Sequence, residues 1–278
     1  MLDYMTNEGK PERLLLGYVT LRGPDLEQVY RYLESNSPCE VSQIVDDLFV
    51  GSDSEGSNHP EECLRFLQTV DMVRKTDEGY VIMNEEVSED TSFGLKLLRH
   101  LKEQGGKQSS LTYILELIAR EDLSTTTQSD LIATIERDDN GYDFSWTDPK
   151  IKQWSYLMDY IGVIRMETEN ELIFYPKRDL VLELLINHHN QTEEDNLTSL
   201  VEYIEKNYWN CMTQSTQPTI YEGLSATLLN MHRSGIIQLQ SYSDGDEVRI
   251  QKPENEGYEN YTNYSIKTKD ASDIREVA

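Results

Sequence analysis

A helix that runs directly into a β-hairpin occurs three times along this sequence, and this repeat limits the folds that the chain can adopt. In the middle copy, residues 148–162 place apolar side chains at helical spacing and end at a glycine, after which "VIRME" and "ELIFY" flank a polar turn. A helix beginning at His59 leads into "MVRK", "TDEG" and "YVIM", and a helix closing at residues 234–235 leads into "IIQLQ", "SDGD" and "EVRI". Three such copies, about 90 and 75 residues apart, indicate an internal repeat. The repeat predicts hairpins at residues 72–83, 163–175 and 236–250.

Further helices are predicted upstream of each hairpin. Apolar residues recur at helical spacing over residues 24–37 and 40–51 before the first hairpin, over 109–122 and 127–139 before the second, and over 196–209 before the third. The segment "QPTIYE" before the third hairpin is too short for more than one helical turn. Two more segments, residues 92–107 and 177–191, are interpreted as connecting helices.

The order of three helices and a hairpin resembles a winged helix-turn-helix unit. The chain is similar to tandem winged-helix proteins of archaeal type over residues 20–85, 107–176 and 195–267, and the likeness rests on element order alone. The resemblance implies a mainly α fold with small β-hairpins, in which tandem winged-helix units are joined by helical connectors. We expect units at residues 20–90, 91–176 and 177–267, the last two each including a connector helix, followed by a polar tail at 268–278. The tail and residues 252–262 are expected to be mobile because they are polar.

Acidic residues outnumber basic ones by 51 to 25, which gives a net charge of −26. Such a protein repels nucleic acid at long range unless a local patch reverses the sign. One interpretation is adaptation to molar salt, where the Debye length falls to about 3 Å and self-repulsion is screened; the composition is similar to that of halophilic archaeal proteins. The other interpretation is an acidic protein that binds basic partners at ordinary salt.

Several classes of site are not predicted. No glycine-rich phosphate-binding motif occurs, so we expect no cofactor and no enzymatic activity. The adjacent His188 and His189 point in different directions on a helix, so we expect two surface histidines and no metal. The three widely spaced cysteines fit neither a disulfide framework nor a zinc knuckle, and we expect buried thiols. We expect a cytoplasmic location and no membrane contact, because no signal-peptide pattern or long apolar run is present.

The candidate chemistry is therefore recognition. In a winged helix the third helix enters the major groove and the hairpin reaches the flanking backbone. Glu61 and Glu62 at the start of the first such helix would repel phosphates, so we interpret the first unit as structural or partner-binding. The cations along residues 96–107 form a stripe that either steers phosphates or pairs with acidic neighbours. The side chains predicted to contact DNA are Lys150, Lys152, Gln153, Ser155 and Tyr156 in the middle unit, Lys96, Arg99, Lys102 and Lys107 on the connector, and Ser225, Thr227, Asn230 and Arg233 in the third unit.

These patterns predict a non-enzymatic protein that binds duplex DNA and a protein partner, the partner through the first unit. It would be a transcription regulator or a DNA-contacting accessory subunit of a DNA-processing or defence complex. Two other classes stay open: an adaptor whose winged helices bind only proteins, and an inhibitor whose acidic surface imitates DNA.

Overall fold

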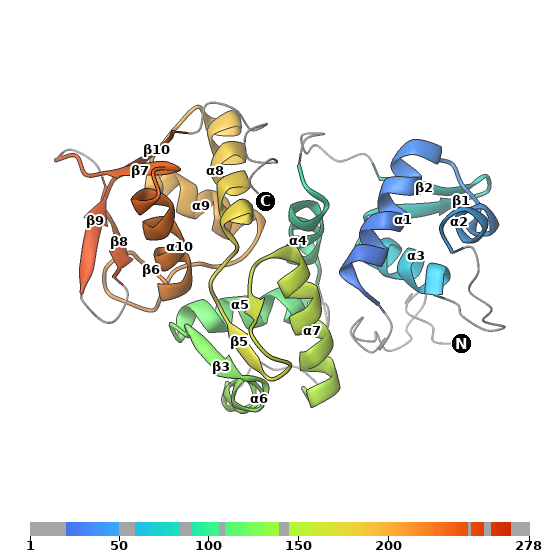
Figure 1. Ribbon diagram of the computed structural model, residues 1–278, viewed down its shortest axis with the longest axis horizontal. Helices are drawn as coiled ribbons and strands as arrows, with labels where there is room; N and C mark the ends of the chain where they lie inside the picture. Colours follow the sequence, from blue (N-terminus) through green and yellow to red (C-terminus); the bar gives the residue numbers. More distant parts are fainter. Residues whose placement is uncertain are drawn as a thin grey trace.

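The computed structural model describes residues 21–49, 59–83, 91–105, 109–138, 145–243, 246–252 and 257–267. Helices and small sheets follow one another in three groups, with the first group at one end of the molecule, the last at the other and α4 to α7 between them (Figure 1). This fold of helices with small, mostly antiparallel sheets agrees with the coarse class that was predicted, and the tandem winged-helix arrangement stays a prediction. In the described part of the chain, no helix is long and apolar enough to cross a membrane.

The first group is a helical cluster closed by a hairpin. Its elements are α1 (Gly23–Asn36), α2 (Val41–Leu48), α3 (His59–Thr69), β1 (Val73–Thr76) and β2 (Gly79–Ile82). β1 and β2 pair antiparallel, as predicted for residues 72–83. Cys39, between α1 and α2, exchanges two backbone hydrogen bonds with Tyr80 of β2, so the chain before α2 extends the hairpin.

The middle group adds a strand that the sequence did not indicate. After α4 (Phe93–Glu103) come α5 (Ser110–Arg120), β3 (Thr125–Thr127), α6 (Gln128–Arg137), α7 (Asp148–Ile161), β4 (Arg165–Met166) and β5 (Glu171–Ile173). β4 and β5 form the hairpin predicted at residues 163–175, and β3 pairs with the other side of β5. The sheet order is therefore β3-β5-β4. α7 ends at Gly162, whose φ of +95° is the left-handed conformation that glycine adopts easily.

The third group departs from the predicted pattern. Its elements are α8 (Arg178–Thr192), α9 (Leu197–Asn207), β6 (Thr219–Ile220), α10 (Glu222–Arg233), β7 (Ile237–Gln240), β8 (Val248–Gln251), β9 (Tyr258–Tyr261) and β10 (Asn263–Ile266). The hairpin predicted at residues 236–250 is wrong, because β7 pairs with β10 while β8 lies between β6 and β9. β9 also lies in the segment that was expected to be mobile. Both strands of the predicted hairpin exist, but alternating burial does not reveal which neighbour each one pairs with.

The middle group packs against each of the other two. α7 contacts both α1 and α4, and α4 also contacts α9. At the other junction, the first N–H of α10, from Glu222, donates to the carboxylate of Asp122 at 2.7 Å, and the Thr227 hydroxyl donates to the carbonyl oxygen of Pro176 at 2.9 Å. The buried apolar side chains accordingly form one connected cluster. The boundaries of three separate domains stay a prediction.

Candidate functional site

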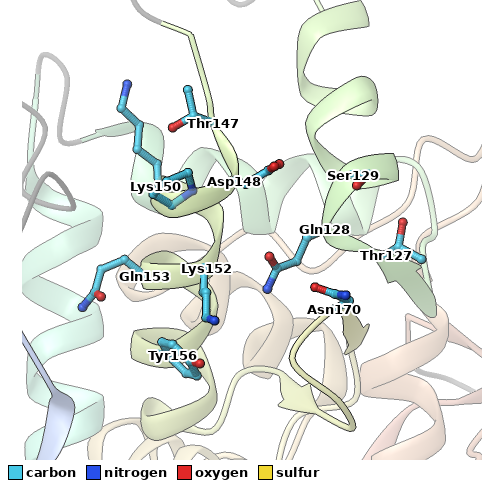
Figure 2. Close-up of a pocket in the computed structure, with 11 residues that line it drawn as sticks. Thr127, Gln128, Ser129, Thr147, Asp148, Lys150, Lys152, Gln153, Tyr156 and Asn170 are labelled. Carbon is cyan, nitrogen blue, oxygen red and sulfur yellow. The ribbon is translucent and has the colours of Figure 1, made fainter. Parts of the chain in front are cut away.

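An open groove of about 960 Å³ lies in the middle group, where the first turns of α6 and α7 meet the β4–β5 turn (Figure 2). Four of the predicted DNA-contacting residues are among those that line it: Lys150, Lys152, Gln153 and Tyr156. The groove thus lies at the start of α7, the helix of the middle unit that was predicted to contact DNA.

The wall opposite α7 is built from the start of α6 and the β4–β5 turn. The Thr127 hydroxyl caps α6 by accepting the N–H of Asp130 at 3.1 Å. Gln128 then holds the turn twice: its backbone N–H donates to the carbonyl oxygen of Asn170 at 3.0 Å, and its side-chain amide donates to that of Glu169 at 2.6 Å. These contacts fix the turn against α6. Gln128 and Asn170 were not among the predicted site residues, although Thr127 and Asp130 form a recognisable N-cap pattern.

Lys152 is the cation that faces this wall. Its ammonium lies 3.0 Å from the Glu169 carboxylate and 5.8 Å from the centre of the Tyr156 ring. The hydrogen bond to Glu169 raises the pKa of Lys152 above its usual value, so the amine stays charged. The side chains of Lys152 and Glu169 are 41% and 77% exposed. An ion pair this exposed contributes little to stability, so an external anion can replace Glu169.

Lys150 and Gln153 extend away from Gln128 and Asn170, on the other side of α7 (Figure 2). The Gln153 amide donates to the carbonyl oxygen of Leu21, just before α1. The Lys150 ammonium donates to the carbonyl oxygen of Ser145 at 2.7 Å. Gln153 therefore helps to join α7 to the first group, and Lys152 and Tyr156 are the predicted residues that face the opposite wall.

The prediction that Ser155 faces outward is wrong. Its side chain is fully buried, and its hydroxyl donates to the carbonyl oxygen of Ile151 at 2.8 Å. A serine whose hydroxyl is satisfied by the preceding turn of its own helix can be buried at little cost, so its polarity is a poor guide to its exposure.

Ser225 and Thr227 of α10 are also buried, which contradicts the prediction for the third group. The Ser225 hydroxyl donates to the carbonyl oxygen of Ile220 at 3.0 Å and accepts the N–H of Gln251 at 3.2 Å. Thr227 is held at the junction with the middle group. α10 is a core helix, because strands cover one side and the chain after β5 covers the other. Of the predicted residues on α10, Asn230 and Arg233 are exposed near its end.

The basic stripe on α4 is occupied by intramolecular ion pairs. Its three described cations pair with carboxylates as follows: Lys96 with Glu34 at 3.3 Å, Arg99 with Glu103 at 3.5 Å, and Lys102 with Glu116 at 2.6 Å. Lys96 is buried as well, so it does not contact an outside phosphate in this conformation. Lys107 lies outside the described residues. Of the two interpretations of this stripe, pairing with acidic neighbours is the one observed.

His188 is buried, so the expectation of two surface histidines is wrong for this residue. Its Nδ1 lies 2.7 Å from the Tyr264 hydroxyl, and its Nε2 lies 3.0 Å from the Ser199 hydroxyl. Tyr264 donates to the carbonyl oxygen of Leu185 at 3.2 Å, so it accepts from Nδ1–H, which leaves Nε2 to accept from Ser199. The arrangement resembles that of a nucleophile and a base, but the ring is fully buried and both of its nitrogens are paired within the fold. We therefore interpret the network as structural.

This network predicts a loss of stability in acid. Burial lowers the pKa of His188 from its usual 6.5, against the opposing effect of Glu194 and Asp195. Above pH 6.5 the ring is neutral in both the folded and the unfolded protein, so it costs no stability. As the pH falls below 6.5, the free energy of unfolding declines, because the folded protein resists protonation of the ring. His188→Gln removes the titration and keeps a donor and an acceptor. Denaturant titrations from about pH 8 to 5 should show a smaller loss for the variant than for the parent; equal losses would exclude His188 as the cause.

No metal site is evident among the described residues, where no group of three or more His, Cys, Asp or Glu side chains is arranged to hold an ion. The three cysteines are free and buried, as expected. Comparisons with protein-family models, curated proteins and solved structures give no match for this chain.

Proposed function

We propose that the protein is a non-catalytic tandem winged-helix protein that contacts duplex DNA through the groove of its middle group. The order α5-β3-α6-α7-β4-β5 with a β3-β5-β4 sheet supports the assignment of a winged-helix unit to this group. In that unit α7 is the recognition helix and the β4–β5 turn is the tip of the wing. The first group, with the same order of helices and hairpin, is the second winged-helix unit.

The observation that carries the proposal is the convergence at the groove. The start of α6, the exposed Lys152 and the β4–β5 turn line one open groove at the face where a winged helix meets DNA. The dipole of α6 favours phosphate at its N-terminus, where the N–H groups of Gln128 and Asp130 are already bonded to Asn170 and Thr127. Lys152 adds a positive charge, and an incoming phosphate can replace Glu169 as its ionic partner. Such a protein acts as a transcription regulator or as a DNA-contacting subunit of a larger complex.

The test is the salt dependence of duplex binding. Fluorescence anisotropy with a random-sequence duplex, from about 0.05 to 1 M salt, gives the slope of log affinity against log salt concentration. Lys152→Gln should weaken binding and reduce this slope by about 0.9, the value for one lost phosphate contact. Lys75→Gln, on the hairpin of the first group, removes an exposed lysine away from the groove and should leave both quantities unchanged.

Equal slopes for the parent and Lys152→Gln would exclude the middle groove as the contact. Equal losses in the two variants would indicate a general charge effect instead of a local site.

A second candidate function is a protein-interaction adaptor. The ion pairs that occupy the α4 stripe favour it, because they leave the acidic surplus of −26 poorly suited to a polyanion. If the parent binds no duplex at any salt in the series, the adaptor becomes the better proposal.

A further inference from the structure

A second open depression, of about 670 Å³, lies between α4, α8 and α9, apart from the groove proposed for DNA. Asn187, Asn190 and Gln191 line it from the last two turns of α8. Their spacing of three and four residues places them on one face of the helix. Within the described residues, the side-chain amides of these three make no hydrogen bond.

The depression differs between its two ends. Asn190 and Gln191 are near the end of α8, which is followed closely in the chain by the start of α9. Arg99 of α4 and Lys206 at the end of α9 supply cations elsewhere in the lining. Lys206 makes no ion pair with a described residue, and Arg99 has a single long contact to Glu103, whose side chain is 60% exposed. Amides therefore lie towards one end, and available positive charge lies towards the other.

A peptide main chain fits the amides better than a nucleic acid does. A carboxamide presents a donor and an acceptor side by side, which matches the N–H and C=O groups of an extended peptide. A phosphate backbone offers acceptors only, and it would meet the Glu202 carboxylate in the lining and the negative end of the α8 dipole. A single carboxylate beside Lys206 and Arg99 lies away from the end of α8, and the two cations offset the Glu202 carboxylate in the lining.

We propose that this depression binds an extended segment of a partner protein. The main chain of the segment pairs with the amides of Asn187, Asn190 and Gln191, and an acidic side chain or a terminal carboxylate pairs with Lys206 and Arg99. This surface is independent of the proposed DNA contact.

The probe is a phage-displayed library of random linear dodecapeptides, selected on the full chain. Selected peptides should carry Asp or Glu, or require a free carboxyl end; synthesis of each peptide with Asp changed to Asn, or with an amidated end, distinguishes the two sources. Asn190→Ala combined with Gln191→Ala should weaken binding about tenfold, as expected for two or more lost hydrogen bonds. Lys206→Glu should abolish the preference for acidic peptides.

Gln238→Ala is the matched control, because Gln238 is an exposed amide on β7, outside the depression. It should leave peptide binding unchanged, and thermal melts should show the parental stability for all variants. The proposal is overturned if no peptide is enriched over a blank selection, or if selected peptides bind the Asn190 and Gln191 double variant as tightly as the parent. Displacement of a selected peptide by a short DNA duplex that the double variant no longer binds would identify nucleic acid as the occupant and also overturn it.

Discussion

Gly223→Ala should destabilise the protein by about 3 kcal/mol, at the upper end of what overpacking a core normally costs. Gly223 is a buried residue in the first turn of α10, and an added methyl group would collide with the carbonyl oxygen of Phe174 and lie 2.7 Å from the Tyr221 ring. The Phe174 backbone has little freedom to retreat, because its N–H is bonded to the carbonyl oxygen of Ser124 at 2.9 Å. Relief of the collision therefore requires α10 to separate from the middle group.

Gly94→Ala is the matched control for this prediction. Gly94 is also in the first turn of a helix, α4. A methyl group there would lie 3.5 Å from its nearest neighbour, the Ile161 backbone, which is an ordinary van der Waals contact. The usual gain of about 0.5–1 kcal/mol for alanine over glycine in a helix should then apply. Urea titrations of the two variants should show opposite shifts in the free energy of unfolding. Similar values for both would mean that α10 and the chain after β5 are less tightly packed than the structure describes.

Raising the salt concentration from about 0.1 to 3 M KCl should raise the melting temperature by roughly 10 °C. The net charge of −26 repels itself most strongly in the compact state, and added ions screen this repulsion. Most of the described ion pairs have at least one side chain that is more than a third exposed, so little stability is lost when salt screens them as well. Differential scanning fluorimetry across the series measures the shift.

The control for salt is a sugar at matched osmolality, which is excluded from the protein surface and so favours the compact state without screening charge. It should reproduce only a small part of the shift. A melting temperature that is flat or falling with KCl would contradict the halophilic interpretation and favour an acidic protein that functions at ordinary salt.

The first two hairpins could be predicted because each one is local. In both cases a charged turn of a few residues joins two strands, so the helix end, the turn and the strands lie in one continuous window of sequence. The pairing of β7 with β10 could not be predicted this way, because β8 and β9 lie between these two strands in the sequence. Its register joins Ile237 with Ile266, and nothing in the strand itself indicates a neighbour that far along the chain. The short β3 was missed for the same reason.

The candidate site was predicted in part. Lys152 and Tyr156 were predicted to face outward because the apolar residues of α7 recur every three or four positions, which leaves few positions for its outer face. Ser155 and Thr227 were misplaced because a small hydroxyl group satisfied by nearby backbone is as compatible with burial as with exposure. The α4 cations were misjudged because their partner carboxylates, such as Glu34 and Glu116, come from other helices. Counting charges along the sequence does not show which side chains pair after the chain folds.

α7 is a single 14-residue helix that packs against α1 and also borders the groove. One side carries Tyr160, whose hydroxyl donates to Glu27 of α1, and another side carries Lys152 at the edge of the groove. Since an α-helix turns and shifts as one rigid rod, a molecule that reorients α7 from the groove must also alter its fit to α1. Coupling of this kind is reciprocal. If a ligand in the groove changes the affinity of the first group for a partner by some factor, that partner changes the affinity of the groove for the ligand by the same factor. α7 therefore joins the first group directly to the edge of the groove.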